Sequence, residues 1–207
     1  ESRDSGDAST DTGIASVEEL LALRPSVIIG PISDNVARKV VDVVVRAGVV
    51  QISPGANGAD FTRMSDNDLF WRTAPSCALE GTVLGRELAA RGATTLGIVY
   101  QRDFCEGGLA GAVEVAFEAA GGKVIATKAF EPNVGALTTE VATVIEDEPD
   151  AVAVLTPTKA ALAVTELAAA GYTGDRLGFV GLSIADHSAD LPAGSIEKAI
   201  ATMPGVE

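Results

Sequence analysis

Short apolar runs alternate with amphipathic stretches along most of the chain. The runs predict strands at residues 27–29, 49–53, 94–100, 123–127, 151–155 and 177–180. The stretches between them place apolar residues three or four positions apart, which is the spacing of one helix face. This spacing predicts helices at residues 36–47, 78–91, 109–120, 137–145 and 159–170.

The helix predicted at residues 36–47 carries two conflicting signals. Val36, Val40 and Val44 lie at helical spacing, but β-branched valine favours a strand locally. We predict a helix, because strands and helices alternate elsewhere and Gly48 is a natural helix end.

Single helices between strands indicate βαβ units, which have parallel sheets. The fold class is therefore α/β, with sheets expected to be covered by helices on both faces. Residues 59–76 show no such period and are predicted to be irregular. Because they end in Pro75 just before a new βα series, they are either a crossing between two lobes or a loop within one sheet.

Composition and charge narrow the function classes. The chain has 207 residues, of which 47% are hydrophobic, which is ample for a packed core. A net charge of -14 disfavours nucleic acid and anionic membrane surfaces, and no apolar run is long enough to cross a bilayer. One histidine and two cysteines leave no zinc cluster, and neither a dinucleotide fingerprint nor a phosphate loop is present. We expect no metal, no cofactor and no catalysis.

Candidate ligand contacts lie in the loops that follow the predicted strands, because open parallel sheets bind ligands at the carboxyl ends of their strands. Ser33, Asp34 and Asn35 open a predicted helix, where they can cap it, contact a ligand or do both. Cys77 and Cys105 form a disulfide if their loops lie at one end of a sheet, and otherwise are two thiols. The residues alone leave both alternatives open.

An ordered set of short segments carries a family resemblance over nearly the whole chain. The set consists of residues 28–31 (IIGP), 51–56 (QISPGA), 70–76 (FWRTAPS), 97–100 (GIVY), 103–110 (DFCEGGLA), 121–124 (GGKV), 130–132 (FEP) and 148–152 (EPDAV). Together they resemble the type I periplasmic binding proteins, the extracellular solute-binding proteins of branched-chain amino acid ABC transporters.

The resemblance implies two Rossmann-like lobes joined by hinge strands, with the ligand captured between them. It assigns residues 1–75 to part of lobe one, 76–202 to lobe two and 203–207 to the start of the return crossing. Ala74 and Pro75 then belong to the hinge, and lobe one is incomplete in this chain.

Carried over position by position, the resemblance implies a set of ligand contacts. Asp34 stands where amino-acid-binding members use serine for the ligand carboxylate, and Asn57 stands where they use threonine. Ser183 replaces the acidic partner of the ligand ammonium, and Cys105 replaces the usual glycine. The remaining implied contacts are Ser33, Asn35, Gly55, Ala56, Phe104 and Thr156.

These departures predict a ligand other than a simple aliphatic amino acid. A ligand carboxylate would meet the like charge of Asp34, and an ammonium would lose a charge-assisted hydrogen bond of ~1.5–3 kcal/mol. We expect an amino-acid-like or amide-like polar molecule, neutral or cationic, with an apolar or aromatic part against Phe104.

The resemblance also implies a role and a location. It predicts a periplasmic or extracellular monomer, either secreted or lipid-anchored at the cell surface, that delivers its ligand to an ABC-transporter permease. A ligand-sensing receptor or regulator with the same lobes is the first alternative. An α/β enzyme is the second, and the residues supply no assembled nucleophile, base or metal set for it.

Overall fold

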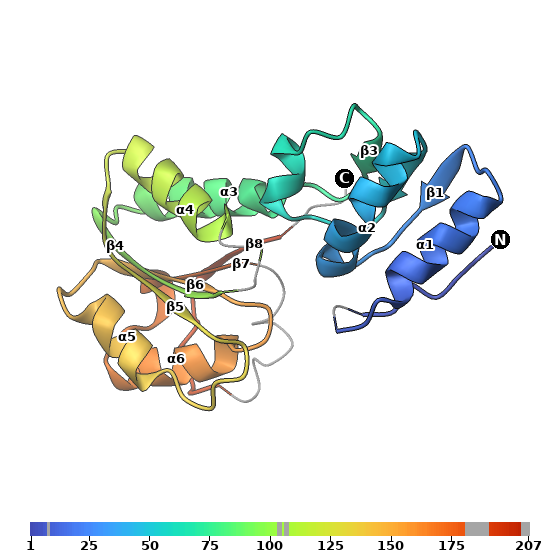
Figure 1. Ribbon diagram of the computed structural model, residues 1–207. Helices are drawn as coiled ribbons and strands as arrows, with labels where there is room; N and C mark the ends of the chain where they lie inside the picture. Colours follow the sequence, from blue (N-terminus) through green and yellow to red (C-terminus); the bar gives the residue numbers. More distant parts are fainter. Residues whose placement is uncertain (8, 103–104, 106–107, 181–190, 204–207) are drawn as a thin grey trace. The chain divides into compact units, whose positions relative to one another are not determined.

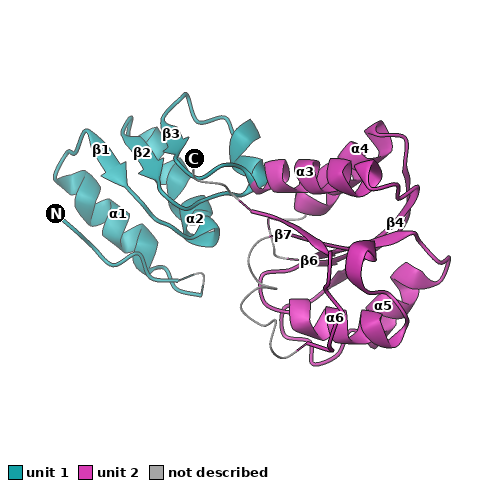
Figure 2. Ribbon diagram, turned by 180° about the vertical axis from the view of Figure 1, so that it is seen from behind, with its two compact units in different colours: residues 1–76 teal, residues 77–207 magenta. Residues whose placement is uncertain are grey.

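The computed structural model describes residues 1–207 except 8, 103–104, 106–107, 181–190 and 204–207. The chain divides into two units, Glu1–Ser76 (unit 1) and Cys77–Glu207 (unit 2), which Figure 2 shows in different colours. This boundary falls one residue after the lobe boundary that the family resemblance implies.

Unit 1 is built on a small parallel sheet with the strand order β1-β2-β3. Its elements are α1 (Thr12–Ala22), β1 (Val27–Ile29), α2 (Asp34–Arg46), β2 (Val50–Ser53), the 3-10 helix η1 (Ala59–Arg63) and β3 (Phe70–Arg72). The valine-rich helix prediction is confirmed as α2, because Val36, Val40 and Val44 are buried on one of its faces. Packing of that face outweighs the local preference of valine for strands.

The prediction that residues 59–76 are irregular holds for residues 64–69 and 73–76 but is wrong for the rest. They contain η1 and the strand β3, which pairs in parallel with β2 and places Phe70 opposite Gln51. A strand of three residues is too short to show a period of two in the sequence. The helix α1 was likewise not predicted, nor was the strand β8 of unit 2.

The sheet of unit 1 has one covered face. Helices α1 and α2 both contribute to the apolar cluster over it, which consists of Val17, Ile28, Val40, Val44 and Val49. Ile29 and Trp71 alternate with the buried strand residues and are 75% and 58% exposed. No helix among the described residues covers this second face, so the expected cover on both faces is found here on one only.

Unit 2 holds a five-stranded parallel sheet with the order β5-β4-β6-β7-β8. Its elements are α3 (Cys77–Ala90), β4 (Thr95–Gln101), α4 (Gly108–Ala119), β5 (Lys123–Phe130), α5 (Thr138–Ile145), β6 (Ala151–Leu155), α6 (Ala160–Ala169), η3 (Gly174–Arg176), β7 (Leu177–Val180) and β8 (Ile200–Thr202). The predicted strands and helices of this region are confirmed, with ends shifted by a few residues.

Helices cover both faces of the unit 2 sheet. Figure 1 shows α3 and α4 on one side of the strands and α5 and α6 on the other. Every residue of the central strand β6 is buried, as expected for a parallel strand between two helical layers. No described helix has the length and apolar content that a membrane span requires.

Glycines let α3 and α4 approach closely. A Cβ atom added to Gly81 of α3 would lie 2.7 Å from the carbonyl oxygen of Leu109 in α4. A Cβ atom on Gly85, one turn further along, would collide with the carbonyl oxygen of Val113. The backbones of the two helices therefore touch where larger side chains would hold them apart.

Candidate functional site

Two loops of unit 1 lie against each other beyond the carboxyl ends of β1 and β2. The Ser53 hydroxyl, at the end of β2, donates a 2.5 Å hydrogen bond to the carbonyl of Pro31 in the first loop. The Ser53 hydroxyl oxygen also accepts the N–H of Ala56 at 3.0 Å. A Cβ atom on Gly55 would lie 2.5 Å from Cγ2 of Ile32, so this close approach requires glycine.

Asp34 joins the two loops directly. Its Oδ1 atom accepts a 2.7 Å hydrogen bond from the backbone N–H of Asn57. Its Oδ2 atom lies 3.7 Å from Nη2 of Arg38, one turn along α2. The structure therefore brings Asp34 and Asn57 together, and the Asp34 charge is partly neutralised by Arg38.

Arg38 organises the surrounding polar groups. Its Nε and Nη2 atoms donate to the Asp60 carboxylate at 2.7 and 2.9 Å, and its Nη1 atom donates to Oδ1 of Asn35 at 3.2 Å. The hydrogen bond from Arg38 holds the pKa of Asp60 below its ordinary value. The sequence analysis missed Arg38 and Asp60, although Asp34 and Arg38 form a recognisable i,i+4 charge pair on a predicted helix.

Two neutral polar side chains remain available at this edge. Ser33 occupies the N-cap position of α2, but its side chain makes no capping hydrogen bond. The hydrogen bonds of the described residues also leave the side-chain amide of Asn57 without a partner, whereas Ala56 beside it is fully buried. Ser33 and Asn57 are thus the groups of unit 1 best suited to contact a ligand.

Thr156 closes a different polar cluster, at the carboxyl ends of β4 and β6 in unit 2. Its hydroxyl is buried and donates a 2.8 Å hydrogen bond to Oε1 of Gln101. The Thr156 hydroxyl oxygen also accepts the N–H groups of Thr158 and Lys159 at 3.3 and 3.1 Å. Through these bonds, Thr156 stabilises the loop that leads into α6.

The exposed neighbour in this cluster is Thr158. Its hydroxyl donates a 3.2 Å hydrogen bond to Oε1 of Gln101, so two threonines share one acceptor. The sequence analysis assigned no role to Gln101 or Thr158. A polar residue at the carboxyl end of an otherwise apolar strand was the signal that could have revealed Gln101.

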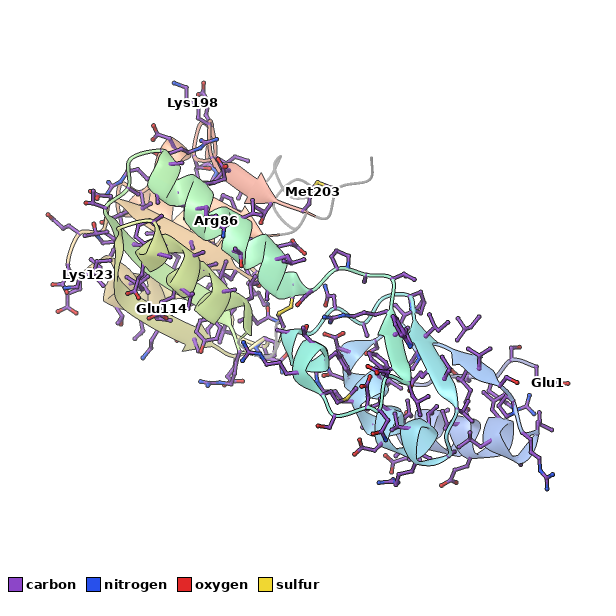
Figure 3. All side chains as sticks on the ribbon, turned by 90° about the horizontal axis from the view of Figure 1, so that it is seen from above. Glu1, Arg86, Glu114, Lys123, Lys198 and Met203 are labelled. Carbon is purple, nitrogen blue, oxygen red and sulfur yellow. A yellow bond between two sulfur atoms is a disulfide. The ribbon has the colours of Figure 1, made fainter. Side chains whose placement is uncertain are left out.

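A disulfide joins Cys77, the first residue of α3, to Cys105 in the segment after β4 (Figure 3). Both residues are buried, and their Cα atoms are 6.3 Å apart. Cys105 has a φ of 57°, a left-handed backbone conformation that favours glycine over other residues. The other predicted contacts of unit 2, Phe104 and Ser183, lie outside the described residues.

The proposed hinge residues follow the last strand of unit 1. Ala74 and Pro75 lie between β3 and α3, in the segment that connects the two units. Pro75 has a fixed φ and no N–H, which suits an extended connection between units.

The chemistry of these clusters is that of hydrogen bonding. They offer hydroxyl, side-chain amide and backbone groups next to helix starts. Among the described residues, no group of three His, Cys, Asp or Glu side chains is placed to hold a metal ion. Parallel α/β units with polar loops at the carboxyl ends of their strands are typical of proteins that bind small molecules.

Comparison with known proteins identifies the class further. Residues 1–206 match the family described as "Periplasmic binding protein", and the chain belongs to that family. Its architecture is the α/β fold of the type I periplasmic binding proteins. A search of curated protein sequences gives no match.

Three solved structures illustrate the shared fold. A solute-binding protein of an ABC transporter from R. palustris, in complex with 4-hydroxybenzoate, superposes with a TM-score of 0.71 at 18% identity, over 88% of this chain and 50% of that one. A periplasmic binding protein type 1 from Bordetella pertussis Tohama I superposes with a TM-score of 0.70 at 18% identity, over 89% of this chain and 52% of that one. A putative branched-chain amino acid ABC transporter from Rhodospirillum rubrum superposes with a TM-score of 0.68 at 20% identity, over 94% of this chain and 56% of that one. The chain therefore spans about half the length of these proteins.

Proposed function

We propose that this protein is an extracytoplasmic solute-binding protein of an ABC transporter, which captures one small polar molecule and delivers it to the membrane permease. The family membership supports this role. The observation that carries it is the link between Asp34 and Asn57, because it holds two loops together at the edge where parallel sheets bind ligands.

The capture step is closure of the two units about the hinge at Ala74 and Pro75. Each unit contributes part of the binding surface, with Ser33 and Asn57 in unit 1 and Thr158 with the predicted Phe104 and Ser183 in unit 2. A solute that contacts both units binds the closed form more tightly, so it shifts the population towards closure. Hinge closure of this kind needs no bond to be made or broken.

The proposed solute is amino-acid-like or amide-like, and is not a simple aliphatic amino acid. The groups left available in unit 1 are a hydroxyl and a carboxamide, which pair well with neutral polar groups. Asp34 adds negative charge nearby, although Arg38 and the Asn57 N–H partly compensate it. A neutral or cationic head group is therefore favoured over a carboxylate.

The disulfide supports the proposed location. Disulfides persist in the periplasm and outside the cell, whereas cytosolic reductants keep most thiols reduced. The bond between Cys77 and Cys105 fits a protein that works in an oxidising compartment.

Calorimetric titration tests the proposed function. The panel contains amino acids, their amides and benzoates, because one structure with this fold holds 4-hydroxybenzoate. We expect one solute to bind with a 1:1 stoichiometry and the Asn57→Ala variant to lose at least about tenfold in affinity, the value of one good hydrogen bond. Asn133→Ala, a change of an exposed asparagine in unit 2, is the control and should bind normally. Tight binding of leucine that survives Asn57→Ala would contradict the proposal.

A further inference from the structure

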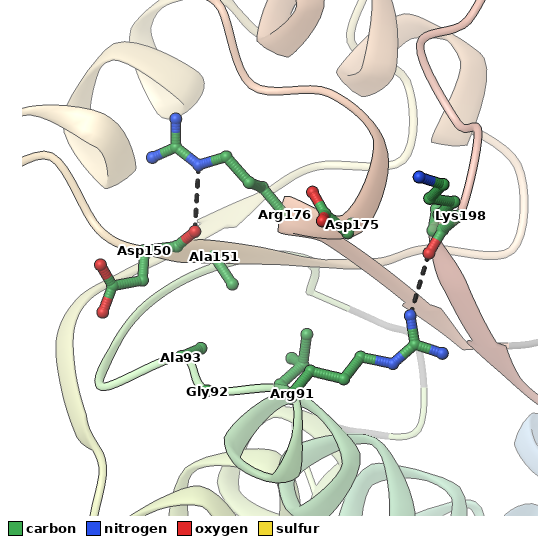
Figure 4. Close-up of a pocket in the computed structure, with 10 residues that line it drawn as sticks. Arg91, Gly92, Ala93, Asp150, Ala151, Asp175, Arg176 and Lys198 are labelled. Atoms are coloured by element: carbon green, nitrogen blue, oxygen red, sulfur yellow. Dashed lines mark hydrogen bonds between the residues drawn. The ribbon is translucent and has the colours of Figure 1, made fainter.

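A cavity lies in unit 2, at the edge of the sheet where β4, β6, β7 and β8 begin. Its volume is about 730 Å³, within the range of small-molecule sites. The candidate solute site uses the opposite edge, where the strands end. The cavity (Figure 4) is lined by Leu88, Arg91, Gly92, Ala93, Asp150, Ala151, Asp175, Arg176, Lys198 and Ala199.

Three cationic side chains, those of Arg91, Arg176 and Lys198, line this cavity. None of them forms an ion pair with a carboxylate of the described residues, whereas Arg38 and Arg102 both do so. The lining carries three positive and two negative charges, so it is positive on a strongly negative protein.

The two guanidinium groups are held in place by the fold. Arg91 donates from Nη1 to the carbonyl oxygen of Lys198 at 3.0 Å, which leaves its Nε and Nη2 atoms without a described acceptor. Arg176 donates to the carbonyl oxygens of Asp150 and Pro149 at 3.0 and 2.7 Å. Its guanidinium also lies 3.9 Å from the ring centroid of Tyr172. Groups fixed in advance lose little conformational entropy when a ligand binds.

The two carboxylates that line the cavity differ in their hydrogen bonds and in their surroundings. Oδ2 of Asp150 accepts hydrogen bonds from the N–H and hydroxyl of Thr94 at 2.8 and 2.7 Å, and from the N–H of Thr95 at 3.0 Å. Because these bonds stabilise its charge within the fold, Asp150 repels an incoming anion less than an unbonded carboxylate would. The second carboxylate, Asp175, is exposed to solvent, as are Arg91 and Lys198, so solvent screens the charges of all three.

An apolar surface completes the cavity. It is offered by the half-buried Ala93 and Ala199, whereas Leu88 and Ala151 are 1% and 2% exposed and add almost no accessible surface. A ligand with only charged groups would leave this surface unused. A short hydrocarbon part would instead be removed from water there.

We propose that this cavity binds a small organic anion, whose oxygen atoms pair with Arg91 and Lys198 and whose short apolar part packs near Ala93 and Ala199. Guanidinium groups bind both carboxylate and phosphate oxygens, so the shared chemistry is that of an oxyanion. This site is independent of the proposed solute site, since it uses the other edge of the sheet.

Titration followed by amide NMR signals tests this site, with succinate and inorganic phosphate as the probes. We expect succinate to shift the amide signals of Gly92, Ala93, Ala151 and Lys198 saturably, and added NaCl to weaken the effect. A stronger response to phosphate than to succinate would contradict the apolar part of the proposal. A response centred on Asn57 would place the anion in the solute site and overturn the proposal.

Matched charge variants separate specific binding from general attraction. The double variant Arg91→Gln/Lys198→Gln should reduce succinate affinity by at least about tenfold. The double variant Lys123→Gln/Lys128→Gln removes the same charge from β5 and should leave the affinity unchanged. Equal weakening in both variants, or the absence of any saturable shift in the native protein, would show that no such site exists.

Discussion

The carboxylate of Asp34 accepts a 2.7 Å hydrogen bond from the backbone N–H of Asn57, a residue 23 positions further along the chain. Asp34 opens α2 and Asn57 lies in the loop after β2, so this bond links two loops that the hydrogen bond from Ser53 to Pro31 also holds together. Both residues were predicted to contact ligand. The structure gives Asp34 a positioning role towards Asn57.

Replacing Asp34 tests this role. Asp34→Ala should speed hydrogen exchange at the Asn57 amide and weaken solute binding, because the loop loses its anchor. Asp34→Asn keeps an acceptor oxygen and should restore much of the protection. Asp42→Ala, an exposed change on the same helix, is the control. Unchanged exchange at Asn57 in Asp34→Ala would show that the bond does not hold the loop.

The disulfide predicts a measurable effect on stability. The chain-entropy estimate for a bridge across 28 residues gives about 3–4 kcal/mol, so Cys77→Ser/Cys105→Ser should unfold at lower denaturant concentration. Intact mass after alkylation, with and without reductant, reports the bond itself. Alkylation of both cysteines without reductant would contradict the disulfide.

Asp150 predicts a pH dependence of stability. The hydrogen bond from the Thr94 side chain, with the backbone bonds of Thr94 and Thr95, lowers the pKa of Asp150 from 3.8 to about 2. A folded pKa below the unfolded value gives stability that is present above pH 3.8 and is lost as pH falls towards 2.

Urea unfolding at several pH values checks this dependence. Asp150→Asn should be less stable than the native protein at pH 7, and the difference should shrink between pH 4 and pH 2. Asp147→Asn changes an exposed neighbour and should show no such trend. A difference that stays constant down to pH 2 would contradict the assigned cause.

The contact between α3 and α4 predicts opposite effects for two glycine substitutions. Gly81→Ala should destabilise the protein by roughly 1–3 kcal/mol, because its methyl group would meet the backbone of Leu109. Gly111→Ala has no atom within 4 Å of its Cβ position and should stabilise α4 by up to about 1 kcal/mol. Thermal unfolding compares the two, and stabilisation by Gly81→Ala would show that the helices do not touch there.

Periodicity predicted the fold well where elements are long. The helix α4 shows a clear apolar stripe, and its prediction agrees closely with the structure. The strand β3 has only three residues, of which Phe70 alone is buried, so no period could reveal it. It is defined by its pairing with β2, which a local pattern does not contain.

The candidate site was predictable in position but less so in role. The rule that loops after parallel strands bind ligands led to Asp34 from the sequence, and the family resemblance added Asn57 and Thr156. Their hydrogen-bond partners depend on long-range contacts, such as that between Thr156 and Gln101 across 55 residues. The sequence therefore indicated which loops hold polar side chains, and the structure showed which of these side chains already form hydrogen bonds within the protein.

Small-angle X-ray scattering during solute titration tests the central claim most directly. The account predicts that the solute identified by calorimetry lowers the radius of gyration of the protein in proportion to occupancy, as hinge closure requires. In Asn57→Ala the same contraction should need a higher solute concentration. A solute that saturates the protein and leaves the radius of gyration unchanged would contradict capture by closure.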